Sequence, residues 1–494
     1  MKEIEKKEET VQVRDKFLDF AGVSTNAPLT KRLVITFVAS VIAYFVLSAV
    51  DLSQYGETAS SGLGLFVAVV IFMVFSGMEV IVSSLLMVFA GIALAFWKWS
   101  DVSAYLGSSQ FYTMLGMVIV AMGCEFTPFG RRIAYIFLEK FGSRPVRLVI
   151  VFGIVTALVS AFVSNIATLI LMSSIGASLL ESMGEKPGES VIGRSLMVLI
   201  GAASMYGGCV LISGSPYGNT MAISMMENAS GGTATITYAQ WAFFGVIIFA
   251  VTIIPFCMIY VKSSGMKNSG YNLPPKEYYE EKLRELGPLR GSEVRWVIIV
   301  IVMVAFMIAG KSTSEMAMLF ATISFLPVVG TTPVRKCLNR VPIHVLLCMG
   351  TIPMMSRLLT GTGVLDALTD VLKSNVSIES PILFSIAACL ITGLAINVCV
   401  NASSAVGPSM VALLTPISMA LGFNPAVVLL PTMLESGFFW AMGMNTIMLM
   451  NKGYGYWDDK DAAIPGYLTI LFTSIVIPII CCGLCGVVGM STRL

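Results

Sequence analysis

The sequence predicts an all-α polytopic membrane protein. Of its 494 residues, 56% are hydrophobic and 12% are charged, and that charged share is about half of what soluble domains carry. The mean hydropathy is +0.84. A soluble core cannot absorb so much apolar side chain, so the surplus must face lipid. Apolar runs of about 20 residues, the length of one membrane-spanning helix, recur along the chain.

Most of the apolar runs predict ordinary membrane-spanning helices. These lie at 33–50, 60–77, 79–97, 109–124, 236–261, 296–310, 314–330, 343–360 and 464–491. Three other apolar regions, 145–183, 193–228 and 380–450, are interrupted by Ser, Asn, Gly and Pro. Irregular backbone within a membrane is tolerated only where it is buried in protein or lines a cavity. We therefore expect these interruptions to form the functional part of the protein.

The distribution of Lys and Arg predicts the orientation, because cytoplasmic segments carry an excess of both. Basic residues collect in the N-terminal arm and at 131–147, 262–295 and 331–341. If each span crosses the membrane once and the region 145–183 enters and leaves the membrane on the same face, all four basic segments lie on the cytoplasmic side. The N-terminus would then lie inside and the C-terminus outside. We expect a multi-pass protein of the plasma membrane.

The two halves of the chain repeat one order of elements. Residues 109–168 read as a helix, an amphipathic stretch and a hairpin with Asn165 at its tip, and residues 343–404 read the same way. The second hairpin, 381–422, has Asn401 at its tip and would open to the outside, whereas the first would open to the inside. The prediction is an inverted-topology repeat with two re-entrant hairpins and two broken transmembrane helices, which is typical of secondary transporters.

Composition argues against several other classes. The 31 Lys and Arg are balanced by 29 Asp and Glu, so no nucleic-acid-binding surface is expected. The ten cysteines lie mostly inside apolar runs, where Cys acts as a small hydrophobe. The one histidine, His344, stands at the start of an apolar run, and no zinc motif or Ser-His pair is present. We do not expect an enzyme.

Two polar clusters interrupt the first half. Residues 160–168 read Ser-Ala-Phe-Val-Ser-Asn-Ile-Ala-Thr at the hairpin tip, and residues 207–219 read Gly-Gly-Cys-Val-Leu-Ile-Ser-Gly-Ser-Pro-Tyr-Gly-Asn. Pro216 lacks a backbone N–H and the glycines free the backbone, so the second cluster should unwind a helix. Unwound carbonyl groups can coordinate a cation such as Na⁺, and the helix N-terminus after the break favours an anion.

The second half supplies the counterparts of both clusters. Residues 396–404 read Ile-Asn-Val-Cys-Val-Asn-Ala-Ser-Ser, and residues 440–446 read Trp-Ala-Met-Gly-Met-Asn-Thr. The two tips and two breaks would converge on one central site for a small anion and small cations. The alternative is that these polar residues only hold helices together. Glu435 shortly precedes the second break and is a candidate proton or cation partner, whereas Glu79 and Glu125 fall at predicted cytoplasmic helix ends.

At these residues the sequence resembles the divalent anion/sodium symporter family of di- and tricarboxylate carriers. That family has Ser-Asn-Thr at each hairpin tip and Thr-Pro-Pro-Asn or Ser-Pro-Pro-Asn at each break. Residues 116–172 are similar throughout, including Glu125, Arg131-Arg132 and Ser164-Asn165. The similarity extends to 214–219, is legible at Asn401 and at 441–445, and covers roughly residues 33–490.

The resemblance implies a site. The substrate would contact Ser164, Asn165, Ile166, Ser215, Asn401, Ala402 and Met442. Cations would be held by Ser160, Ser164, Asn165, Gly214, Asn401 and Ala441. Four family hydroxyls are missing, because Ile166, Ala402 and Met442 stand in place of threonine and Val400 in place of serine. The second half is the more degraded, so the resemblance leaves substrate identity and sodium dependence open.

The function implied is secondary active transport of small di- or tricarboxylate anions by an elevator-type homodimer, through Na⁺ symport. A Na⁺-independent dicarboxylate exchanger or a carrier of another small anion is the alternative, and a channel is a remote one. Residues 1–32 would form a cytoplasmic arm, 33–124 and 296–360 scaffold helices, 125–228 and 361–450 transport units, 229–262 a connecting helix, 263–295 a cytoplasmic loop and 451–494 the last helix.

Overall fold

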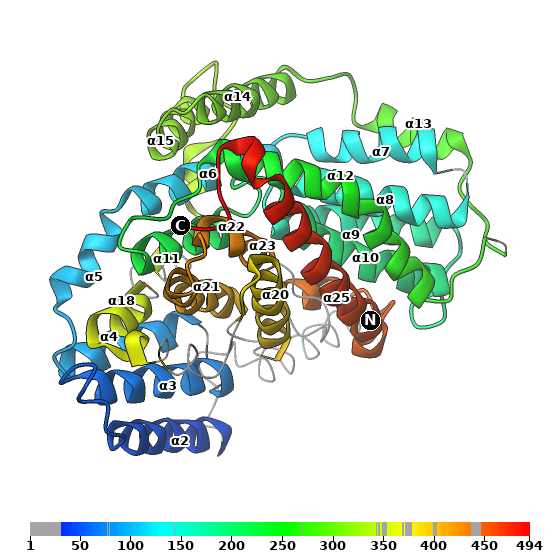
Figure 1. Ribbon diagram of the computed structural model, residues 1–494. Helices are drawn as coiled ribbons and strands as arrows, with labels where there is room; N and C mark the ends of the chain where they lie inside the picture. The colour runs from blue at the N-terminus through cyan, green and yellow to red at the C-terminus, as the bar shows by residue number, and fades with distance from the viewer. Residues whose placement is uncertain are drawn as a thin grey trace.

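The chain is built from helices throughout the part that the structure, a computed structural model, describes (Figure 1). That part is residues 31–494 without 77, 79, 143, 269, 342, 344–345, 348–352, 368–369, 371–377, 399–402 and 436–445. Extended backbone pairs in these ranges only at an isolated antiparallel bridge between Phe423 and Arg493. The predicted all-α class is confirmed.

The first half runs from the periphery of the molecule into its core. Its helices are α2 (Lys31–Ser48), α3 (Ala59–Phe75), α4 (Val80–Ala93), α5 (Trp99–Leu106), α6 (Ser109–Glu125), α7 (Phe129–Phe141), α8 (Pro145–Ser160), α9 (Asn165–Ser182), α10 (Val191–Gly208), α11 (Pro216–Ala229) and α12 (Tyr238–Ser263). The α2 and α3 pair lies at one edge of the molecule in Figure 1, whereas α8, α9, α10 and α12 pack together.

The second half begins with a short amphipathic helix and ends with a long one. Its helices are α13 (Lys276–Glu285), α14 (Gly291–Ile308), α15 (Thr313–Phe325), α16 (Val334–Leu338), α18 (Pro353–Thr362), α20 (Pro381–Val398), α21 (Ser403–Ala420), α22 (Pro425–Val428), α23 (Leu430–Glu435), α24 (Thr446–Lys452) and α25 (Asp459–Leu484). Six helical stretches among the described residues are long and apolar enough to cross a membrane. The chain is therefore a polytopic membrane protein.

Apolar side chains cover much of the outer surface. Ile35 and Phe45 on α2 are each 66% exposed, and Ile254 on α12 is 57% exposed. Large apolar residues with this exposure would be unfavourable in water, but lipid chains cover them without cost. The exposed apolar surface therefore follows from the composition.

Two predicted spans differ from the structure. The predicted span 314–330 is wrong at its end, because α15 stops at Phe325. Pro327 follows, and the N–H groups of Thr331 and Thr332 both donate to the carbonyl of Ser324, at 3.1 and 3.0 Å, which closes a turn. In the interrupted region 380–450, the helix expected after the second hairpin is already interrupted between α22 and α23, where Pro431 lacks the N–H that a continuous helix needs. Its predicted break at 440–446 lies almost entirely outside the described residues.

The two hairpins open at opposite ends of α25. The loop after α9 meets the segment before α25, where the Tyr456 hydroxyl donates to the carbonyl of Glu185 at 3.2 Å. The chain after α21 meets the segment after α25, where the N–H of Asn424 donates to the carbonyl of Thr492 at 3.0 Å. With 26 residues, α25 is about 39 Å long at 1.5 Å per residue. The open ends of the helix pairs α8–α9 and α20–α21 therefore lie at opposite ends of α25.

Three of the basic segments meet on one face. Ion pairs join them at Arg132 and Glu293 (2.9 Å), Lys276 and Glu139 (3.1 Å), and Arg340 and Glu125 (3.3 Å). Hydrogen bonds from its ammonium group to Glu139 and Glu280 raise the pKa of Lys276, so this link stays charged at neutral pH. A common face for the basic segments is what a cytoplasmic location of all three requires.

The halves also contact each other reciprocally. Helix α11, which follows the break in the first half, packs against α21, the second arm of the other hairpin. Helix α24, at the corresponding place in the second half, packs against α9, the second arm of the first hairpin. This exchange of partners is the arrangement that a pseudo-twofold axis between two repeats would produce.

Candidate functional site

The tip of the first hairpin is a tight turn between α8 and α9. Ser164 caps α9, and its side chain accepts a hydrogen bond from the N–H of Ala167 at 3.3 Å. The buried Ser160 hydroxyl lies 2.5 Å from the carbonyl of Ser204 on α10 and 3.0 Å from Oδ1 of Asn165. Ser160 thus ties the end of one arm to the start of the other and to the neighbouring helix.

Asn165 is buried against the end of α10. A Cβ atom built on Gly208 would lie 2.0 Å from Oδ1 of Asn165, so only glycine leaves room for this amide. The next residue back, Gly207, is equally constrained, since its Cβ would lie 2.0 Å from the carbonyl oxygen of Ala157. The glycine pair therefore lets the hairpin tip approach the broken helix closely.

The predicted unwinding before Pro216 is confirmed. Helix α10 ends at Gly208, and α11 begins with Pro216 as its first residue. The Nδ2 atom of Asn219 lies 3.0 Å from the carbonyl oxygens of both Gly208 and Leu211. The indole N–H of Trp241 on α12 donates to the carbonyl of Cys209 at 3.0 Å. Side chains therefore satisfy carbonyl groups that the break leaves without a helical partner.

Three carbonyl oxygens of this region converge on one point. A Cβ atom on Gly214 would lie 2.8 Å from the oxygen of Ala161, 2.9 Å from that of Gly208 and 3.0 Å from that of Ser160. We call this point the Gly214 cradle. Tip and break supply its oxygens together, and the amide of Asn165 adjoins it at Gly208. Unwound carbonyls are the kind of group that can coordinate a small cation in transporters.

The N-terminus of α11 adds a feature for anions. Ser215 precedes this helix, is partly exposed and makes no capping hydrogen bond with its side chain. Its hydroxyl is thus not used for capping, and the first N–H groups of α11 after Pro216 lie at the same end of the helix. A helix of 14 residues presents the positive end of its dipole at this place.

The structure brings some predicted residues together and not others. Ser160, Asn165 and Gly214 meet as described, with Ser164 and Ser215 in the adjoining turns. Ile166 is 44% exposed on the first turn of α9, so its side chain does not join the buried cluster. Four predicted residues of the second half lie outside the described residues: Asn401, Ala402, Ala441 and Met442.

No role was assigned from the sequence to two further residues that contact the break. Asn219 belongs to the motif, but its donation to several carbonyl groups depends on how the loop folds back. Trp241 lies 32 residues after its acceptor Cys209, and no local pattern connects them. Both act by holding the unwound backbone in place.

We predict that Trp241→Phe destabilises the protein by about 1–3 kcal/mol, because it leaves the buried carbonyl of Cys209 without a donor while keeping most of the ring. Thermal unfolding in detergent measures this effect. Trp99→Phe is the matched control, since Trp99 is 53% exposed and should tolerate the change. Equal unfolding temperatures for the two variants would contradict the assigned role.

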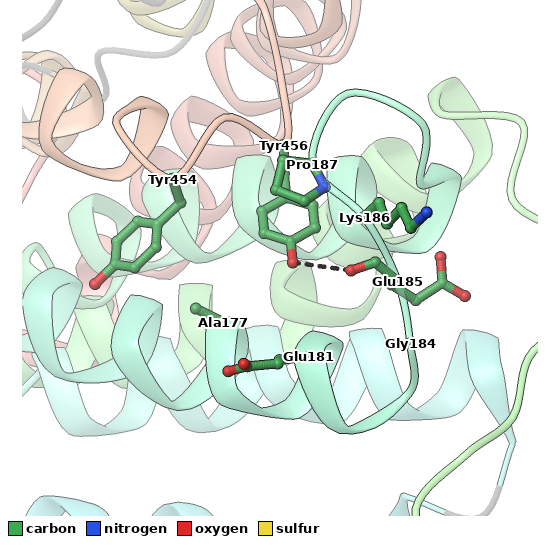
Figure 2. Close-up of a pocket in the computed structure, with 8 residues that line it drawn as sticks. All are labelled: Ala177, Glu181, Gly184, Glu185, Lys186, Pro187, Tyr454 and Tyr456. Atoms are coloured by element: carbon green, nitrogen blue, oxygen red, sulfur yellow. Dashed lines mark hydrogen bonds between the residues drawn. The ribbon is translucent and has the colours of Figure 1, made fainter. Parts of the chain in front are cut away.

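A separate pocket of about 450 Å³ lies at the opposite end of α9 (Figure 2). It is lined by Ala177, Glu181, Gly184, Glu185, Lys186, Pro187, Tyr454 and Tyr456. Figure 2 shows the Tyr456 hydroxyl directed at the Glu185 carbonyl across this pocket. None of the predicted site residues lines it, so it is distinct from the hairpin tip.

Comparison with solved structures shows the fold. The chain is similar to MtrF of Neisseria gonorrhoeae, whose structure is described as illuminating a class of antimetabolite efflux pumps. The TM-score is 0.55 and the identity 11%, and the match covers 91% of this chain and 94% of that one. The chain is also similar to the Alcanivorax borkumensis transporter YdaH, with a TM-score of 0.52 and 11% identity over 82% of this chain and 89% of that one.

Comparison with characterised sequences points to transport. The sodium-dependent dicarboxylate transporter SdcS of Staphylococcus saprophyticus is 27% identical over 215 residues, which cover 42% of this chain and 40% of that protein. SdcS of Staphylococcus aureus is 21% identical over 404 residues, which cover 76% of each chain. The model of the citrate transporter family matches residues 65–437, from α3 through both hairpins. The chain therefore belongs to the citrate transporter family, and it is a membrane transporter rather than an enzyme.

Proposed function

We propose that this protein is a secondary active transporter of small di- or tricarboxylate anions, coupled to Na⁺. The observation that carries the proposal is the Gly214 cradle, where the hairpin tip and the break together surround one point with carbonyl oxygens. The adjoining α11 N-terminus is suited to a carboxylate. The SdcS relatives, named sodium-dependent dicarboxylate transporters, support the same pairing of ligands.

The proposed mechanism is alternating access by an elevator motion. The hairpins and broken helices, within 125–228 and 361–450, would move as a transport unit against scaffold helices in 33–124 and 296–360. A cation in the Gly214 cradle would bind oxygens of both tip and break, so it would draw the two together. The substrate site beside α11 would thereby be completed only when the cation is bound.

The proposed setting is the plasma membrane, with a homodimer as the working unit. The cluster of basic segments around Arg132, Lys276 and Arg340 supports a cytoplasmic location for that face. The C-terminal residues, which contact the open end of the second hairpin, would then lie outside. A Na⁺-independent exchanger is the second candidate, favoured by Ile166 at a position where the resembling family has a hydroxyl.

Transport assays on proteoliposomes test the proposal. Uptake of labelled succinate, citrate, 2-oxoglutarate and sulfate is measured with and without an inward Na⁺ gradient. We expect saturable uptake of at least one carboxylate, stimulated by the gradient. Uptake that needs an internal anion and ignores Na⁺ would establish the exchanger instead. Absence of uptake and of exchange for all carboxylates would refute both.

Gly214→Ala should remove the stimulation by Na⁺. The added Cβ would lie within 3.0 Å of three carbonyl oxygens and would push away the oxygens that the cation would use as ligands. We expect the Na⁺-stimulated rate to fall at least about tenfold, which corresponds to about 1.4 kcal/mol. Gly218→Ala is the matched control in the same motif, because its Cβ would meet only the Ser215 hydroxyl at 3.6 Å. Full Na⁺ stimulation of Gly214→Ala would place the cation elsewhere.

A further inference from the structure

Glu435 at the end of α23 is a fully buried carboxyl group with half of its hydrogen-bonding capacity unused. Its Oε1 atom accepts a hydrogen bond from the Thr473 hydroxyl of α25 at 2.9 Å. Its Oε2 atom has no partner among the described residues. The hydroxyls of Thr392 and Ser474 are likewise fully buried and without a partner there. Buried polar groups are nearly always paired, so unpaired polar atoms on Glu435 and on its neighbour Ser474 point to a missing ligand.

Helix α20 packs along α23 up to Glu435. The Ser385 hydroxyl donates to the carbonyl of Val428 at 2.6 Å, and Cys389 Sγ lies 3.7 Å from Thr432 Oγ1. A further turn along, a Cβ on Gly393 would lie 3.4 Å from Glu435 Oε1. The same face of α20 therefore follows α23 in register as far as Glu435, where Gly393 adjoins the carboxyl group.

The surroundings of Glu435 supply no positive charge in the described part of the chain. Helix α20 presents the Cys389 thiol to it, and the first break presents the thiol of Cys209. Helix α25 presents Thr473 and Ser474. Helices α21 and α22 contain no titratable residue. On α11, Glu227 is held at the far end by Gln110 and Thr235, and Tyr217 lies in the first turn.

An ionised carboxylate in this position would be uncompensated, which costs several kcal/mol in a buried site. We propose that Glu435 is a proton-binding site of the transport cycle, protonated in the conformation described here and deprotonated when the transport unit exposes it. A proton on Oε2 turns this atom into a donor, and the Ser474 hydroxyl of α25 beside it can accept from it. A hard metal cation would need several oxygen ligands at once, more than the orphans provide beside the α20 backbone.

The repeat explains why such a group stands in the second half. Glu435 lies ten residues before Asn445, as Cys209 lies ten residues before Asn219. The second half thus has a carboxyl group where the first has a thiol. It also lacks the hydroxyls that the resembling family uses for a cation, with Val400 and Ala402 in their place. The inference rests on the proposed function: one charge would be carried by Na⁺ at the Gly214 cradle and another by a proton at Glu435.

Proton movement can be measured separately from substrate movement. Proteoliposomes of the full-length protein are filled with a pH-sensitive dye, with equal Na⁺ on both sides, and succinate or the best carboxylate is added outside. We expect the interior to acidify. Glu435→Gln, which imitates the protonated group, should reduce this signal at least about tenfold. The same variant should still exchange labelled for unlabelled substrate, because exchange needs no net proton transfer. Glu315→Gln, an exposed acid on α15, is the matched control.

The outcomes separate the two proposals. If Glu435→Gln acidifies the interior as much as the wild type, Glu435 is not the proton site. The same holds if the wild-type protein exchanges substrate without any acidification. Neither outcome contradicts the carrier function. A protein with no exchange of any carboxylate fails the proposed function itself. If Glu435→Gln does not fold, Thr473→Val and Thr473→Ser replace it. The serine retains the donor to Glu435 and should preserve the pH profile of uptake, whereas the valine should shift it, and identical profiles would overturn the site.

Discussion

Asn165→Ala is expected to abolish carboxylate uptake. The amide is buried between the Ser160 hydroxyl and Gly208, where tip and break meet. Its removal leaves a void at the edge of the Gly214 cradle and, under the proposed function, would take away an oxygen ligand for the cation and a donor for the substrate. Hydrogen bonds to charged groups contribute about 1.5–3 kcal/mol each, so uptake should fall roughly a hundredfold. Initial rates of labelled uptake in proteoliposomes measure the loss.

A second variant tests the same contact from the other side. Gly208→Ala places a Cβ 2.0 Å from the Asn165 oxygen and must displace the amide, so it should reproduce the loss of uptake. Asn339→Ala is the control, because that asparagine is exposed on the loop after α16. Wild-type uptake by Asn165→Ala in correctly folded protein would refute the assignment of the hairpin tip to the site.

The sequence was sufficient for most helices of this fold because their ends are chemically marked. Pro145 and Pro216 begin α8 and α11, and Ser164 caps α9, so hairpin and break follow from local rules. The end of α15 was not predictable in this way. Its residues remain apolar past Phe325, and the chain turns because Ser324 receives hydrogen bonds from Thr331 and Thr332. Apolar periodicity cannot distinguish such a turn from further helix.

The candidate site was predictable to the extent that its residues stand in motifs. Ser160, Asn165 and Gly214 meet through the close approach of α8 to α10, which the glycine pair before the break permits. The carbonyl oxygens of the cradle have no signature in a sequence, because every residue has a carbonyl group. The same holds for Trp241, whose indole reaches Cys209 only in the folded protein. Tertiary contacts determine which backbone groups are left for a ligand.

Asn219→Leu is expected to have the largest effect on stability. The leucine has a similar volume but no donors, so the carbonyl groups of Gly208 and Leu211 lose hydrogen bonds of 3.0 Å each. The buried Gly208 carbonyl is left unpaired, which costs about 1–3 kcal/mol, whereas the Leu211 carbonyl keeps the N–H of Gly214 at 3.0 Å and loses only about 0.5–1.5 kcal/mol. We expect a total of roughly 1.5–4.5 kcal/mol, together with loss of uptake. Thermal unfolding in detergent and uptake by proteoliposomes measure the two effects.

The control for Asn219→Leu lies on the same helix. Asn228→Leu removes an exposed amide whose contact is a 3.3 Å hydrogen bond to the Ser224 hydroxyl, so its unfolding temperature should stay close to that of the wild type. The distinction between the two asparagines follows from burial and from the number of carbonyl groups each one serves. If both variants unfolded alike, the break would be held by helix packing alone, and the carbonyl group of Gly208 would have to be satisfied in another way.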